Sequence, residues 1–137
     1  MCIRDSIICV DVSRGLAQDY SAFVIIDITH APWKLVGKYR NKDIRPMLFP
    51  NVIYNVATNY NNAHVLIEVN DIGEAVAASL YYDVEYENVL MCAMRGRSGQ
   101  VVGQGFSGNK VQMGVKMSKT VKAVSYTHLT LPTNREV

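Results

Sequence analysis

The sequence has no apolar run approaching the roughly 20 residues that a membrane-spanning helix needs, so it offers no candidate membrane segment. Its N-terminus also lacks the layout of a signal peptide. Cysteine is scarce: the three residues are odd in number and have no metal-ligand spacing, which favours small buried side chains in a reducing compartment. The formal net charge is only +2. Bulk charge therefore gives no argument for nucleic acid, although a weakly basic chain can still carry a local basic face.

What is present is enough apolar material for a core. The chain has 137 residues, of which 49% are hydrophobic, and this length suits one domain better than two. Its two ends read differently from the rest. Residues 1–6 (MCIRDS) and 123–137 (AVSYTHLTLPTNREV) resemble translated sequencing-adapter sequence. We therefore expect non-native tails at 1–6 and 123–137 and one partial domain over residues 7–122.

Three β-rich runs open this predicted domain, at residues 7–12, 20–29 and 33–39. The first two are rich in Val and Ile and are bounded by turn residues, as buried strands are. Apolar and polar positions alternate in the third, so we expect a half-buried strand with Trp33 on its apolar side. The short turns between the runs predict an antiparallel meander.

The second part of the domain alternates helices and strands. Helical spacing begins at Pro50, a residue suited to a first helical turn, and an apolar run at 63–69 predicts a fourth strand. Asp71 and Glu74 form a capping-box variant that predicts a second helix. Residues 88–94 predict a fifth strand, 95–108 a glycine-rich loop or hairpin, and 111–122 the start of a helix. A meander followed by this alternation predicts an α/β fold built on a mixed sheet with helices on its faces.

Two carboxylates occupy equivalent positions in two of these strands. Asp11 lies between Val10 and Val12, and Glu68 follows the apolar run of the fourth strand. A carboxylate within an apolar strand is costly to bury unless it is paired or binds a cation. If the two strands are neighbours, the pair suits Mg²⁺ or Mn²⁺, which prefer oxygen ligands. The alternative is that each acid is exposed at a strand end or pairs with a basic neighbour such as Arg14.

Three long stretches resemble the nuclease domain of terminase large subunits from tailed, myovirus-type phages: VDVSRGLAQDYSAFVIID, IEVNDIGEAVA and MCAMRGRSGQVVGQGFSGNKVQMGVKMSKTVK. The resemblance implies a ribonuclease H-like fold and an endonuclease that cuts concatemeric viral DNA during head filling. It places two of the family's three acidic metal ligands on Asp11 and Glu68. The third, an Asp far downstream, has no counterpart here, so the fragment itself is expected to be inactive.

The resemblance also carries expectations about partners. It implies double-stranded DNA as substrate, a portal and a small terminase subunit as partners, and host cytoplasm as the location. The ATPase motor of the family is not within this sequence. Positive charge late in the chain, at Arg95, Arg97 and Lys110, predicts a glycine-rich contact to the phosphate backbone.

The alternatives to this function are a related enzyme, a non-catalytic module and an ATPase lobe. A junction resolvase of the same fold would use the same acids, and a DNA-binding or docking module would have lost catalysis. An actin-like ATPase lobe wants Gly soon after the first-strand Asp, where this chain has Ser13 and Arg14. The G-x-G-x-x-G at residues 103–108 lacks the downstream acid of a dinucleotide site, so we expect no nucleotide cofactor.

Overall fold

The computed structural model describes residues 4–14, 19–69, 72–95, 99–103 and 111–115. In chain order, its elements are β1 (Ser6–Asp11), β2 (Ser21–Asp27), β3 (Lys34–Asn41), α1 (Phe49–Asn59), β4 (His64–Ile67), α2 (Gly73–Ala78), a π-helical turn (Ser79–Asp83), β5 (Met91–Arg95), β6 (Gly99–Gly103) and β7 (Val111–Met113). No helix in these ranges is long and apolar enough to cross a membrane.

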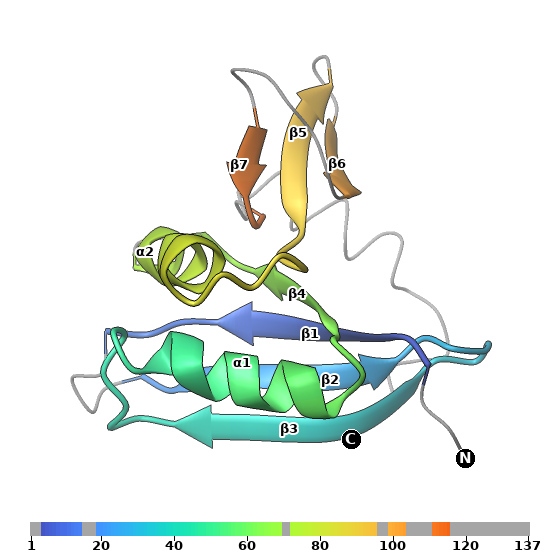
Figure 1. Ribbon diagram of the computed structural model, residues 1–137, viewed down its shortest axis with the longest axis horizontal. Coiled ribbons are helices and arrows are strands. Elements are labelled where there is room, and N and C mark those ends of the chain that lie inside the picture. The colour runs from blue at the N-terminus through green and yellow to red at the C-terminus, as the bar shows by residue number, and fades with distance from the viewer. Residues whose placement is uncertain (1–3, 15–18, 70–71, 96–98, 104–110, 116–137) are drawn as a thin grey trace.

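The main sheet has the strand order β3-β2-β1-β4 (Figure 1). β1 pairs antiparallel with β2, and β2 pairs antiparallel with β3, which confirms the predicted meander. β4 then pairs with β1 in parallel. The predicted mixed sheet is therefore correct, and the parallel pair brings the carboxyl ends of β1 and β4 to the same edge.

The chain continues the sheet beyond β4 in two short pieces. Val89 bridges Val65 in parallel, and Val115 bridges Glu68 in parallel. Between these bridges the chain leaves the sheet to form β5, β6 and β7, which make a second sheet in the order β6-β5-β7. In Figure 1 this second sheet projects from the body of the molecule beyond α2. The predicted hairpin over 95–108 is confirmed for its described part, β6.

The core lies on one face of the main sheet. Alternate residues of each strand turn toward it, so the pattern in β1 and β2 runs buried, half-buried, buried. α1 covers this face with Phe49, Ile53 and Ala57, which are four residues apart and share one side of the helix. The rings of Phe49 and Phe23 lie 6.1 Å apart. α2 and the turn after it complete the same core with Val76, Ala77 and Leu80. Both described helices thus pack on one face.

The third strand departs from the predicted alternation. The register between β2 and β3 shifts between Ile25 and Ile26, where a β-bulge interrupts the ladder. An extra residue changes which side chains face inward. Val36 packs against the core out of phase with the predicted alternation, whereas Tyr39 packs there in phase with it. Trp33 lies outside the strand and is 66% exposed, so its predicted place on the buried side is wrong.

Two local predictions about the second half are also wrong. Residues 111–113, expected to begin a helix, form β7, in which Val111 pairs with Ala93 of β5. The edge of β5 that β6 does not cover has backbone groups that need partners, and β7 supplies them. A β-branched residue such as Val111 suits a strand. Helix α2 takes Ile72 as its N-cap, without a side-chain hydrogen bond. The predicted cap residue, Asp71, lies outside the described residues, as do residues 116–122.

Asp27 ends β2 at the edge of the sheet opposite to the carboxyl end of β1. Its Oδ1 accepts hydrogen bonds from the backbone N–H of Thr29 at 3.0 Å and from the Thr29 hydroxyl at 2.6 Å. The same hydroxyl oxygen accepts from the backbone N–H groups of Arg4 and Asp5. The hydrogen bonds from Thr29 hold the pKa of Asp27 below its usual value. The carboxylate therefore fastens the start of β1 to the end of β2.

A pH dependence of stability follows from Asp27. Because its folded-state pKa is lowered, its ionised form stabilises the fold above the ordinary carboxyl pKa of about 3.9, and this stability is lost as pH falls through the folded value. We expect Asp27→Asn to lower the urea midpoint at pH 7. The difference from the unsubstituted chain should shrink below about pH 4. Asp43→Asn removes an exposed carboxylate outside this network and controls for net charge. An equal difference at both pH values would contradict the assignment.

Candidate functional site

The two predicted acids lie side by side at the carboxyl edge of the main sheet. The last registered pair of β1 and β4 is Val10 with Ile67, and Asp11 and Glu68 are the residues that follow. The backbone N–H of Glu68 donates to the carbonyl of Val10 at 2.9 Å, so the pairing continues to this point. Paired strands lie about 4.8 Å apart. The structure therefore brings the backbones of the two predicted ligands together.

Both acids also belong to the same face of the sheet. Val10 and Ile67 are buried against the helices, and successive side chains of a strand point to opposite faces. Asp11 and Glu68 thus turn to the face that α1 and α2 do not cover. Asp11 is exposed there and Glu68 is half-buried. Two carboxylates on neighbouring strands and on one face make a local concentration of oxygen ligands.

The end of β1 is fixed by a pair of serines that the sequence reasoning missed. The backbone N–H of Ser13 donates to Ser21 Oγ at 2.9 Å, across the turn that joins β1 to β2. The Ser13 hydroxyl donates to the carbonyl of Asp19, also at 2.9 Å. Ser21 is fully buried. The sequence signal for this contact is a serine at the start of the otherwise apolar strand β2. A hydroxyl buried there needs a hydrogen-bond partner.

Two glycines hold the backbone that carries Glu68. A Cβ added to Gly73 would lie 1.9 Å from the carbonyl oxygen of Glu68, and one added to Gly114 would lie 2.2 Å from that of Ile67. Gly114 has a positive φ of 85°, a conformation that other residues rarely adopt. The N–H of Val115, the next residue, donates to the Ile67 carbonyl at 2.8 Å. Helix α2 therefore packs closely against the Glu68 carbonyl, and the chain at Gly114 packs against the neighbouring Ile67 carbonyl.

Cys9 lies two residues before Asp11, on the same face of β1. It pairs with Val24 of β2 and Leu66 of β4, so its surroundings are apolar. Burial raises the pKa of the Cys9 thiol. The thiol is therefore protonated at neutral pH, and it is a poor ligand for a hard cation. Of these side chains, the carboxylates are the ones with the chemistry to bind a hard cation.

The donor set fits a hard divalent cation in part. Carboxylate oxygens are the ligands that Mg²⁺ and Mn²⁺ prefer, and Asp11 and Glu68 supply them from two rigid strands. Within the described part of the chain, no group of three or more His, Cys, Asp or Glu side chains gathers to hold a metal ion. Two carboxylates lie in one place, and a complete metal site would need further donors.

The other predicted site residues lie on the projecting sheet or outside the description. Arg95 is the last residue of β5, the strand that leaves the main sheet after Leu90. Arg97 and Lys110 fall outside the described residues. Their contact with DNA stays a prediction.

A comparison with known families adds a further finding. A family model described as Terminase RNaseH-like domain matches residues 8–125, which is most of the chain. The match confirms the ribonuclease H-like fold, and it agrees with the observed meander, parallel fourth strand and two helices. It also confirms the resemblance to terminase nuclease domains. The individual roles of Asp11 and Glu68 stay predictions.

Proposed function

This chain belongs to the terminase RNaseH-like domain family, and from that premise we propose that Asp11 and Glu68 are two ligands of a divalent-metal site that cleaves DNA. The observation that carries the proposal is their adjacency: they follow the registered pair Val10–Ile67 on neighbouring parallel strands. Their shared orientation, away from the buried face, leaves both carboxylates on the side from which a substrate can approach. Fold alone does not define a function, so the proposal rests on these two side chains.

The chemistry of the site divides between the metal and the protein. Bound Mg²⁺ or Mn²⁺ would activate water and stabilise the leaving oxygen of a phosphodiester. The protein's part is to hold carboxylate oxygens in fixed positions, and the strand ends do this. Ser13 and Ser21 fix the end of β1, and Gly73 and Gly114 let the chain pack closely around Glu68. A third acidic ligand would come from a part of the longer protein outside this sequence, so the fragment alone would be inactive.

In its biological setting, we propose that the longer protein is the large subunit of a phage DNA-packaging terminase. Its nuclease would cut concatemeric viral DNA without sequence preference during head filling, in the host cytoplasm. An ATPase domain, a portal and a small terminase subunit would be its working partners. Metal ions held by the carboxylates would contact the phosphodiester and not the bases. Phosphate contacts position DNA without reading its sequence, so such a site suits sequence-independent cutting.

The test uses the full-length protein that contains this domain. Supercoiled plasmid is incubated with Mg²⁺ or Mn²⁺, and nicked and linear products are measured on a gel. We expect cleavage with either ion, complete loss on chelation with EDTA, and recovery when excess Mg²⁺ is restored. A synthetic four-way junction serves as a second substrate. Cleavage of the junction but not of the plasmid would replace the packaging nuclease with a resolvase, and metal-independent cutting would contradict the proposed chemistry.

A further inference from the structure

We propose that Arg40, supported by the ring of Tyr20, binds the phosphate backbone of the DNA and guides it across β2 to Asp11 and Glu68. This inference rests on the proposed nuclease function, because it assigns the path by which that substrate reaches the acids. The sequence pattern drew attention to Arg95, Arg97 and Lys110 instead. The structure places a different basic group, on β3, in line with the two carboxylates.

The line follows from the strand register. Ala22 of β2 pairs with Asp11 on one side and with Arg40 of β3 on the other. Glu68, the residue after β4, lies next to Asp11, because the preceding residues Val10 and Ile67 are paired. Residues directly opposite one another in a sheet project from the same face. Arg40, Ala22, Asp11 and Glu68 therefore form one row across four strands, on the face that the described helices leave uncovered. The next row contains Lys38, opposite Val24.

The spacing along this row suits a DNA strand. With strands about 4.8 Å apart, the backbones at Arg40 and Asp11 are roughly 10 Å apart, so the two positions lie within a few nucleotides of one another on a bound DNA strand. Between them lies only the methyl group of Ala22. Because the side chain of Ala22 is small, it does not project far from the sheet, and a DNA backbone can lie across this position. A phosphate bound at Arg40 would thus be a near neighbour of the phosphate at the acids.

Arg40 is held in place by an aromatic ring. Its Cζ lies 4.7 Å from the centroid of the Tyr20 ring, a cation–π distance. Arg40 is exposed, and Tyr20 is 45% exposed, so the pair lies at the surface. Stacking leaves the edge donors of a guanidinium available, and these match the oxygens of a phosphate. The ring therefore orients the guanidinium without neutralising its charge.

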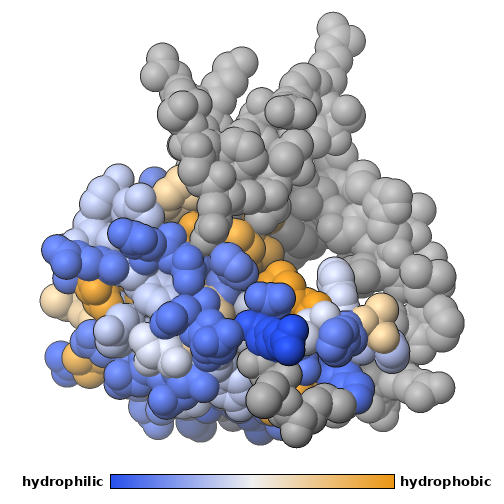
Figure 2. Space-filling model, turned by 45° about the vertical axis from the view of Figure 1, so that its right-hand side comes forward, coloured by the Kyte–Doolittle hydropathy of each residue, from blue (hydrophilic) through white to orange (hydrophobic). Residues whose placement is uncertain are grey.

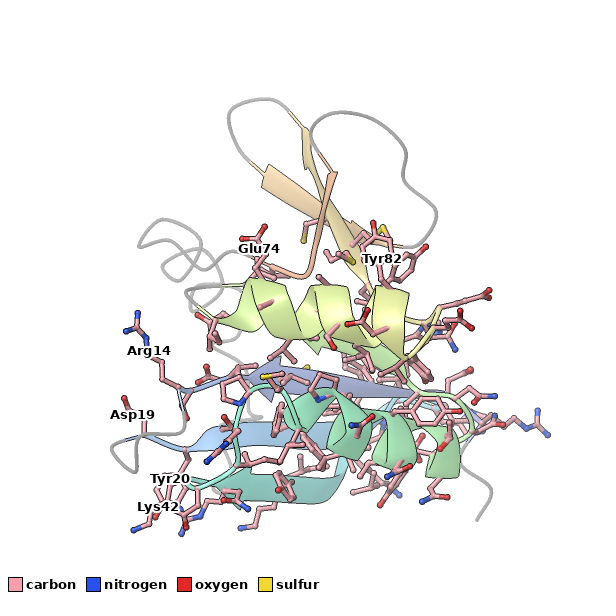
Figure 3. The ribbon with its side chains drawn as sticks, turned by 60° about the vertical axis from the view of Figure 1, so that its left-hand side comes forward. Arg14, Asp19, Tyr20, Lys42, Glu74 and Tyr82 are labelled. Atoms are coloured by element: carbon pink, nitrogen blue, oxygen red, sulfur yellow. The ribbon has the colours of Figure 1, made fainter. Side chains whose placement is uncertain are left out.

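Charge around the row favours DNA over a protein partner. Lys38, Arg40 and Lys42 are all exposed, and β3 (KLVGKYRN) contains no acid. Figure 3 shows Arg14, Asp19, Tyr20 and Lys42 gathered at the same end of the main sheet. Asp19 and the exposed Asp43 oppose this charge in part. A divalent cation bound at Asp11 and Glu68 would offset those two carboxylates, and the basic residues then outnumber the remaining acids. This arrangement is best suited to a polyanion whose backbone runs from Arg40 to the carboxylates of Asp11 and Glu68.

The experiment measures binding separately from cleavage. Full-length protein carrying Asp11→Asn is titrated onto a fluorescein-labelled DNA duplex by anisotropy at several salt concentrations. Loss of one phosphate contact should lower the slope of log K against log salt by about 1, and weaken binding roughly tenfold at about 0.1 M salt. We expect this of Arg40→Gln. Arg40→Lys should keep the slope, and Tyr20→Leu should weaken binding by about threefold with the slope retained.

Lys34→Gln is the matched control. Lys34 is exposed on the same strand, at its other end, so it changes the net charge equally, yet lies roughly 20 Å along β3 from Arg40 at 3.3 Å per residue. If Arg40→Gln binds DNA with the same affinity and slope as Lys34→Gln, the inference is overturned. In the unsubstituted Asp11 background, Arg40→Gln should raise KM for plasmid and leave kcat within about threefold. Undiminished cleavage by Asp11→Asn would contradict the proposed nuclease site. The binding measurement at Arg40 could still be interpreted, because it does not depend on cleavage.

Discussion

Replacing Asp11 with Asn in the full-length protein is expected to lower metal-dependent plasmid cleavage by at least about 10³-fold, or roughly 4 kcal/mol in activation free energy. Asn keeps the size of the side chain but removes the charge that a divalent cation requires. Asp11 is exposed at the end of β1, so no packing is lost. The measurement is the initial rate of supercoiled plasmid loss at saturating Mg²⁺, and isothermal titration with Mg²⁺ should show weaker binding.

A matched variant separates a ligand from a surface carboxylate. Glu74 is exposed in the first turn of α2, six residues from Glu68, and Figure 3 shows it on that helix. Glu74→Gln removes the same charge from the same region and should leave the rate within about twofold, as surface substitutions usually do. Glu68→Gln should behave like Asp11→Asn. If Asp11→Asn cuts plasmid at the rate of Glu74→Gln, the proposed site has no chemical basis.

The main architecture could be predicted because each signal was local and repeated. Runs rich in Val and Ile, bounded by turn residues, defined β1 and β2, and the helical spacing that begins at Pro50 defined α1. The position of Asp11 within an apolar strand singled it out before any partner was known. The adjacency of β1 and β4 was a conditional prediction, and the registered pair Val10–Ile67 confirms it.

The predictions that were wrong concern features that depend on contacts between distant segments of the chain. Trp33 lies at the surface outside β3, and the register of that strand shifts between Ile25 and Ile26; no local pattern marks either feature. β7 forms because the free edge of β5 is nearby, so the helix pattern after Val111 was overridden by tertiary pairing. The position of Arg40 in line with Asp11 was missed because the two residues are related only through Ala22, on a third strand.

The hydropathy of the surface adds little information about the site. The face shown in Figure 2 is mainly hydrophilic outside the grey residues, with a short apolar band.

Gly73→Ala is expected to have the largest effect on the fold near the site. The added Cβ would lie 1.9 Å from the Glu68 carbonyl oxygen and 3.0 Å from its carbon, and both belong to backbone that cannot rotate away. Either α2 or the strand end must move. Overpacking of this kind costs about 1–3 kcal/mol or more, which a urea unfolding series would measure. Because the displaced backbone carries Glu68, we also expect cleavage by the full-length protein to fall more than about tenfold.

Gly37→Ala provides the comparison that gives this result its meaning. A Cβ at Gly37 would meet Ile25 Cδ1 at 2.8 Å, which is the far end of a flexible side chain and can rotate. The same chemical change should therefore cost well under the Gly73 value and leave cleavage nearly intact. Gly114→Ala, with its positive φ of 85° and a 2.2 Å approach to the Ile67 carbonyl, should resemble Gly73→Ala. If all three variants were equally stable and active, the backbone around Glu68 would be free to adjust, and close packing by glycine would have no part in positioning that carboxylate.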